Sequence, residues 1–194
     1  MSKPARILAF AGSLRRDSYN KKLVKAAAKG AEAAGADVTL IDLTEYPLPV
    51  FNEDIESASG MPDEAKALKK LFLEHDALLI SAPEYNSSIT AALKNAIDWV
   101  SRTESKDEPM VAAFAGKTAA LLAASPGGFG GLRGLVHVRA ILENIQVTVL
   151  PDQIAVPKAH EAFNGDGTLK DDGLRKRVEG LGAKLAEVTA KLNA

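Results

Sequence analysis

The sequence predicts an α/β fold in which helices cover both faces of a parallel sheet. Two observations support this prediction. Short apolar runs alternate along the chain with longer segments whose apolar residues recur at helical spacing. Strands that alternate with helices are joined by right-handed crossovers and therefore run parallel. The length of 194 residues suits one domain, which we expect to span residues 1–194.

Three strands and two helices are predicted in the first half of the chain. Arg6–Ala11 is an apolar run that ends at Gly12, and the Ala-rich helix after it ends before Gly35. A second apolar run leads into prolines that interrupt regular structure, and Pro62 suits the first turn of the next helix. The third strand is apolar throughout. In order, these elements are Arg6–Ala11, Tyr19–Ala34, Val38–Leu43, Pro62–His75 and Ala77–Ala82.

The second half of the chain repeats the alternation. Its final helix carries apolar residues every three or four positions, which is typical of a face that covers a sheet. The elements are Ile89–Ser101, Thr118–Ala124, Leu132–Asn144, Gln146–Leu150 and Asp171–Leu192. Two stretches, Glu45–Gly60 and Thr103–Gly116, are expected to lack regular structure. Loops of this length are usually functional or contact a partner, and a solvated insertion is the alternative for the second one.

Five strands without a second βαβ half favour the flavodoxin-like strand order 2-1-3-4-5. In sheets of this kind, ligands bind in the crevice outside the carboxyl ends of the strands. The loops that follow the first, third and fourth strands all reach that edge. These three loops are therefore the candidate ligand-binding segments.

The first loop, Gly12–Asn20, carries hydroxyls, an amide and guanidinium groups around the start of the first helix. A phosphate gains there from unpaired backbone N–H groups and from the positive end of the helix dipole. Arg15 or Arg16 can add a charge-assisted contact. Shorter hydrogen bonds are expected from Ser13, Ser18 and Asn20. The alternative is a capped helix, with Ser18 as the N-cap and both arginines simply exposed.

The second and third loops suit a flat ring with heteroatoms at its edge, such as a flavin. Pro83, Glu84, Tyr85 and Asn86 offer a rigid backbone, a carboxylate, an aromatic ring and an amide directly after the third strand. After the fourth strand, Ser125 offers a hydroxyl and Gly128 allows the backbone to approach the ring closely. Phe129 either covers an open ring face or packs on a neighbour. Neither a P-loop nor a Gly-x-Gly-x-x-Gly dinucleotide motif is present.

Residues 12–20, 83–99 and 125–134 resemble the NAD(P)H-dependent FMN reductase family, which includes quinone, azo and chromate reductases. The resemblance covers nearly the whole chain and implies bound FMN, with NADPH or NADH as co-substrate. It places phosphate contacts on Ser13, Arg15, Ser18 and Asn20. It places isoalloxazine contacts, largely through the backbone, on Pro83, Glu84, Tyr85 and Asn86, with further contacts on Ser125 and Gly128. The chain departs from many relatives at Thr90, where they have proline, which should change the helix start but not the cofactor.

The resemblance implies hydride transfer from NAD(P)H through FMN to a small-molecule acceptor. Quinones, azo compounds, free flavin and metal oxyanions such as chromate are the acceptors considered. This chemistry needs no general acid or base, so no catalytic residue is assigned. A homodimer or homotetramer is expected, with Asp98–Arg102 and Thr103–Gly116 at the interface. The alternatives are an electron-transfer flavodoxin that serves protein partners and a cofactor-free regulatory domain.

Composition limits the remaining possibilities. The chain has 24 basic and 25 acidic residues, a formal charge of −1, which argues against nucleic-acid binding. It also argues against an electron carrier, because such carriers tend to be acidic. The absence of cysteine, of a signal-peptide pattern and of a long apolar span suggests a cytoplasmic protein without membrane contact. The three histidines lie far apart in the sequence, so no metal site is expected.

Overall fold

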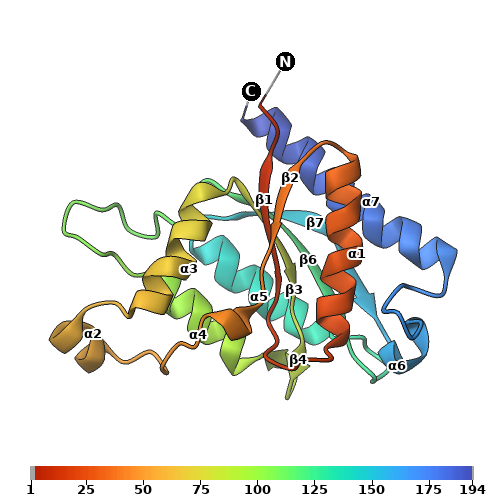
Figure 1. The fold of residues 1–194 in the computed structure, drawn as a ribbon, viewed down its shortest axis with the longest axis horizontal. Coiled ribbons are helices and arrows are strands. Elements are labelled where there is room, and N and C mark those ends of the chain that lie inside the picture. The colour runs from red at the N-terminus through yellow and green to blue at the C-terminus, as the bar shows by residue number, and fades with distance from the viewer. Residues whose placement is uncertain (1–2, 194) are drawn as a thin grey trace.

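The computed structural model describes residues 3–193 and contains the parallel sheet expected from the sequence (Figure 1). Its strands run in the order β2-β1-β3-β6-β7, and every neighbouring pair is parallel. When only these five strands are numbered along the chain, the order becomes 2-1-3-4-5, the predicted flavodoxin-like order. The strands are β1 (Arg6–Ala11), β2 (Asp37–Leu40), β3 (Ala77–Ser81), β6 (Thr118–Ala124) and β7 (Thr148–Val156).

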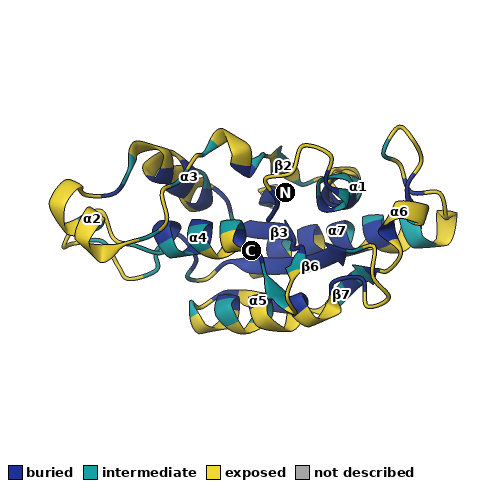
Figure 2. Cartoon of the chain, turned by 90° about the horizontal axis from the view of Figure 1, so that it is seen from below, coloured by how far each residue is buried: buried dark blue, intermediate teal, exposed yellow. Residues whose placement is uncertain are grey.

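Helices cover both faces of the sheet. Two of them, α1 (Tyr19–Ala33) and α7 (Asp172–Leu192), pack against one face and against each other. The other face is covered by α3 (Asp63–Glu74), α4 (Ala91–Val100) and α5 (Leu132–Asn144). Figure 2 shows the strands buried between helices whose outward sides are exposed. The central strands read as continuous apolar runs because both faces of this parallel sheet are covered.

Two predicted strands have wrong boundaries. The second strand ends at Leu40 rather than Leu43, because Asp42 accepts a hydrogen bond from the Thr44 N–H and caps a 3₁₀ turn at Leu43–Glu45. The fifth strand begins at Thr148 and extends to Val156, six residues beyond its predicted end. Pro151 and Asp152 interrupt its apolar pattern, and the ladder with β6 shifts register there. The alternation of apolar residues therefore stops at Leu150, but the bulge allows the strand itself to continue to Val156.

Three short elements were not predicted. The helix α2 (Glu53–Ser59) lies within the stretch expected to be irregular, and it has no buried residue that would produce an apolar period. A two-stranded hairpin, β4 (Glu84–Tyr85) and β5 (Ser88–Ile89), occupies the loop after β3. The short helix α6 (Ala159–Ala162) follows β7. Within residues 3–193, no helix combines the length and the apolarity that a membrane crossing requires.

The segment Thr103–Gly116 contains no helix or strand, as expected, but a buried lysine anchors it. Lys69 on α3 is only 1% exposed, and its Nζ lies 2.7 Å from both the Arg102 carbonyl oxygen and Glu108 Oε2. Trp99, at the end of α4, is buried within its own chain, and its indole N–H donates to the Pro49 carbonyl. Trp99 therefore covers the core of its own chain.

Candidate functional site at the carboxyl edge of the sheet

Three loops meet where β1, β3 and β6 end, at the lower edge of the sheet in Figure 1. The first of them, Gly12–Ser18, leads into α1. Ser13 is buried, and its hydroxyl accepts a hydrogen bond from the Arg15 N–H over 3.3 Å. Arg15 and Arg16 are both exposed. The loop therefore keeps its backbone compact while both guanidinium groups reach solvent.

The start of α1 is suited to an anion. Ser18 is buried at the N-cap position, yet within residues 3–193 its hydroxyl makes no capping hydrogen bond to the helix. No acidic residue occupies the first turn, so the positive end of the helix dipole is not neutralised within the helix. The first N–H groups of any helix lack intrahelical acceptors. The Ser18 hydroxyl, these N–H groups and the nearby arginines are the donor set that a phosphate monoester requires.

Asn20 has partners within the protein that the sequence did not predict. Its side-chain Nδ2 donates to the Ala124 carbonyl, and its Oδ1 accepts from the Ala124 N–H and from the Ser81 hydroxyl, at 2.8–2.9 Å. These hydrogen bonds occupy Oδ1 and one of the two Nδ2 hydrogens, so most of the hydrogen-bonding capacity of the side chain is used within the protein. Because Ala124 ends β6 and Ser81 ends β3, Asn20 joins the roots of all three loops.

The loop after β3 is a tight hairpin. Asn86 and Ser87 form its turn with φ of +50° and +65°, the left-handed conformation that a two-residue type I′ turn needs. Pro83 is buried at the root of the hairpin and Tyr85 is exposed near its tip. The Glu84 carboxylate turns toward α5, where it pairs with the Arg133 guanidinium. Only the backbone of Glu84 therefore remains available to a ring.

The loop after β6 is open on one side and fixed on the other. The Ser125 hydroxyl accepts a hydrogen bond from the Gly127 N–H over 3.2 Å. No atom of residues 3–193 beyond the two chain neighbours of Gly128 would lie within 4 Å of a Cβ added to that glycine. The exposed Phe129 ring packs against the Arg133 guanidinium, whose central carbon lies 5.2 Å from the ring centre. Phe129 therefore has a neighbour in its own chain, which fits the packing interpretation.

Thr90 links the first loop to the hairpin. Its hydroxyl donates to the Gly12 carbonyl over 2.6 Å and accepts from the Leu93 N–H over 3.1 Å, so it caps α4 as well. As a result α4 begins at Ala91, two residues later than predicted. Thr90 thus sets the start of α4 and joins that helix to the first loop.

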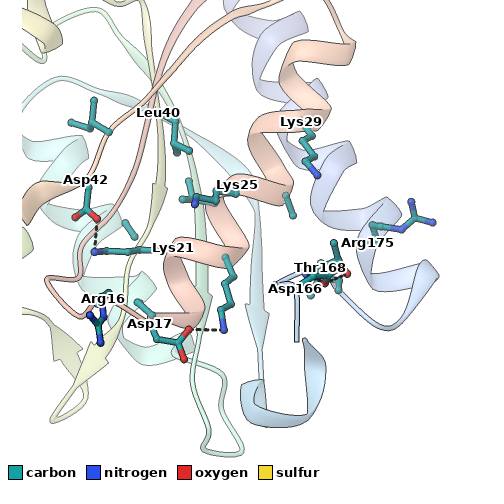
Figure 3. Close-up of a pocket in the computed structure, with 18 of the residues that line it drawn as sticks. Arg16, Asp17, Lys21, Lys25, Lys29, Leu40, Asp42, Asp166, Thr168 and Arg175 are labelled. Carbon is teal, nitrogen blue, oxygen red and sulfur yellow. Dashed lines mark hydrogen bonds and ion pairs between the residues drawn. The ribbon is translucent and has the colours of Figure 1, made fainter. Parts of the chain in front are cut away.

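Two cavities flank this edge. One, of about 630 Å³, follows α1 and contains mostly charged side chains (Figure 3). Several are already paired: Lys21 with Asp42 and Lys22 with Asp17, each at 2.6 Å. The other cavity, of about 540 Å³, is mostly apolar, and Leu14 at its wall borders the first loop. Among residues 3–193, no cluster of three or more histidine and acidic side chains could hold a metal.

The fold and these loops define a flavodoxin-like mononucleotide-binding protein. Its donors suit one phosphate, and its hairpin and glycine loop suit a flat ring. The chain matches the family of NADPH-dependent FMN reductases over residues 5–161 and belongs to that family.

Known proteins of this kind resemble the chain over nearly its full length. The chain is 37% identical to the NAD(P)H-dependent FMN reductase of Pseudomonas aeruginosa over 180 residues, 92% of each protein. It is 33% identical to the NADPH:quinone oxidoreductase of Arabidopsis thaliana over 198 residues, covering 96% of this chain and 93% of the relative. The solved structure of the flavoenzyme NAD(P)H:(acceptor) oxidoreductase from Paracoccus denitrificans has a TM-score of 0.78 and 28% identity, covering 96% and 98% of the two chains. FMN is accordingly the cofactor of this chain and NAD(P)H its co-substrate.

Proposed function

We propose that the chain passes reducing equivalents from NAD(P)H to small-molecule acceptors, with quinones as the main class. The observation that carries this proposal is the exposed hairpin tip at Tyr85 beside the uncovered Gly128, which together leave space for a flat ring. Relatives in Arabidopsis thaliana and Oryza sativa are named as NADPH:quinone oxidoreductases, which supports the choice of acceptor. Azo compounds, free flavin and chromate are further acceptors that an open site would admit.

The roles of individual residues follow from the three loops. Ser13, Arg15 and Ser18 hold the phosphate together with the first N–H groups of α1, and Asn20 contributes its backbone N–H. The backbone of Pro83–Asn86 lies along the ring edge, with Tyr85 at its side. Ser125 and the backbone at Gly128 contact the ring from the loop after β6.

The chain binds and orients its cofactor and needs no acid–base residue of its own. When bound, FMN supplies the hydride and electron chemistry, and the protein sets its position and electrostatic surroundings. The exposed Tyr85 and the open face at Gly128 leave room for a flat donor or acceptor beside the ring. One open face that serves both substrates predicts broad acceptor specificity.

An absorption spectrum followed by anaerobic titration tests the proposal. The purified protein should carry one FMN per chain, lose its visible flavin absorption on adding NAD(P)H and regain it on adding a quinone. An electron-transfer flavodoxin would stay oxidised with NAD(P)H alone, and a cofactor-free domain would be colourless. Either result would overturn the proposed activity.

We also propose that the protein self-associates as a homodimer or homotetramer and works in the cytoplasm. The absence of cysteine supports a reducing compartment. The predicted contact residues Asp98–Arg102 are engaged within the chain: Asp98 pairs with Lys94, and Arg102 pairs with Glu56. Exposed apolar residues nearby, Leu14, Val50 and Met110, are better placed for a partner. They lie around the apolar cavity and on the segment Thr103–Gly116.

A further inference from the structure

The helix α5 begins without a capping side chain of its own. Its N-cap is Gly131, with φ of +91°, a conformation that glycine adopts readily and that leaves no side chain to accept from the helix. A Cβ at this position would also lie 2.6 Å from the Ala123 Cβ. The backbone therefore requires glycine here, and the first N–H groups of α5 need an acceptor from elsewhere.

Glu84 supplies that acceptor from a hairpin about fifty residues earlier. Its Oε2 accepts from the Arg133 N–H at 3.0 Å and from the Gly134 N–H at 3.3 Å. These are the second and third residues of α5, the positions that an N-cap side chain normally serves. Its Oε1 accepts from Arg133 Nε at 2.8 Å and also pairs with the terminal nitrogen of the same guanidinium. The Glu84 side chain is only 7% exposed.

The hairpin and the helix also fit closely around this carboxylate. A Cβ on Gly134 would lie 3.3 Å from the Ser88 carbonyl oxygen and 3.4 Å from the Glu84 Cβ. A second link joins the same elements, because His137 Nδ1 lies 2.9 Å from the Ser88 hydroxyl. Without Glu84, the hairpin would keep only this exposed bond and its packing against the helix.

We propose that Glu84 is a positioning residue that caps α5 from outside and thereby fixes the hairpin 84–89 and the loop 125–131 as one unit. Both segments flank the ring, and the proposal rests on the cofactor site assigned above. Only the backbone of Glu84 faces the ring, while its carboxylate sets where that backbone lies. Arg133 and the positive end of α5 offset the negative charge of the carboxylate, so a buried anion is tolerated beside the cofactor site.

The test compares Glu84→Ala and Glu84→Gln with two control variants. Glu143→Gln makes the same chemical change at the other end of α5, where Glu143 pairs with Arg139 on the surface. Leu142→Ala destabilises α5 from its buried side and leaves Glu84 in place. For each protein, we would measure the FMN dissociation constant, the visible circular dichroism of bound FMN and the melting temperature of the FMN-free protein.

Glu84→Ala should weaken FMN binding roughly 10-fold or more and change the visible circular dichroism at saturating FMN. Glu84→Gln keeps one carbonyl oxygen as an acceptor and should recover part of both effects. Glu143→Gln should resemble wild type, and Leu142→Ala should lower the melting temperature without changing the dichroism. If Glu84→Ala fails to fold, Glu84→Gln carries the same comparison.

The proposal is overturned if the Glu84 variants bind FMN with wild-type affinity and dichroism. It is also overturned if Leu142→Ala reproduces their flavin effects at an equal loss of melting temperature. A wild-type protein without FMN would instead contradict the cofactor assignment. In that case the melting temperature still distinguishes the cap, because Glu84→Ala lowers it and Glu143→Gln does not.

Discussion

The Asn20 side chain bonds to both backbone polar groups of Ala124, 104 residues away. Nδ2 donates to the Ala124 carbonyl and Oδ1 accepts from the Ala124 N–H, each at 2.9 Å. The same Oδ1 accepts from the Ser81 hydroxyl at 2.8 Å. An amide is the side chain that can donate and accept at one site in this way. The first turn of α1 is thus fixed to the ends of β3 and β6, the two strands that lead into the proposed ring-binding loops.

Asn20→Ala should destabilise the protein by about 2–3 kcal/mol, because it leaves the buried N–H and carbonyl of Ala124 without their partner. Chemical denaturation of the FMN-free protein measures this loss. Asn164→Ala is the matched control, since the Asn164 side chain makes an exposed bond to Thr168. It should change stability by no more than about 0.5 kcal/mol. Equal effects at the two positions would contradict the structural role of Asn20.

Arg15→Ala should weaken FMN binding roughly 10- to 100-fold, from the loss of a charged hydrogen bond of about 1.5–3 kcal/mol. The folded protein should keep its stability, because Arg15 is exposed. Isothermal titration of FMN into the FMN-free protein measures the change. Arg16→Ala is the natural comparison, since Arg16 lines the cavity along α1 (Figure 3). An unchanged affinity in Arg15→Ala with a loss in Arg16→Ala would transfer the phosphate contact to Arg16.

The sequence was sufficient for the strand order and for the position of the three loops. Apolar runs and helical spacing report burial directly, so the central strands were found with their boundaries nearly correct. The hairpin at Asn86–Ser87 was missed because its strands are only two residues long. Asn86 was the one residue that indicated a turn there, because asparagine tolerates positive φ.

The partners of the site residues could not be predicted in the same way. Asn20 was predicted to be a site residue because it is polar and follows β1, and the structure does place it at the carboxyl edge of the sheet. Its contact with Ala124 depends on how α1 packs across the sheet, which local sequence does not encode. The Glu84–Arg133 pair likewise joins residues 49 apart. In both cases, the sequence placed a polar residue at the right edge and the prediction assigned it to the ligand, because residue type and position do not reveal which protein groups a side chain meets.

Asp76 should make stability depend on pH at the edge of the sheet opposite the cofactor site. Burial raises the pKa of its carboxyl, but hydrogen bonds from the Arg6 side chain and N–H outweigh burial and hold the pKa below its ordinary value of 3.8. Folding thus favours the ionised form. The resulting stability is complete above the ordinary pKa and is lost as pH falls through the lowered one.

Asp76→Asn should therefore be destabilised by about 1 kcal/mol at neutral pH, a modest value because Arg6 is partly exposed. The difference from wild type should shrink as pH falls below about 4. Urea denaturation at a series of pH values measures it. A difference that stays constant or grows toward low pH would contradict this assignment.

Lys69→Met should loosen the segment Thr103–Gly116 and destabilise the protein by about 3 kcal/mol, because Glu108 loses its buried cation. Limited proteolysis should cut the segment faster than in wild type. Lys70→Met is the matched control, because Lys70 is exposed and pairs with Glu74 at 3.8 Å. Equal cleavage rates in both variants would show that the segment is held by other contacts.

Self-association should depend on the exposed apolar residues near α2 and α4. Val50 is 82% exposed beside the apolar cavity, whose lining includes the adjacent Pro49. Large exposed apolar surfaces of this kind mark interaction sites. Light scattering of wild type should give a mass at least twice the 20.4 kDa of one chain.

Val50→Glu should shift that mass toward the monomer, because a carboxylate would have to lose its water in the contact. Leu192→Glu is the matched control: Leu192 is 65% exposed but ends α7, which packs on the opposite face of the sheet from α3 and α4. It should leave the mass unchanged. A wild-type monomer with full activity would overturn the proposed assembly, and an unaltered oligomer in Val50→Glu would place the contact on another face.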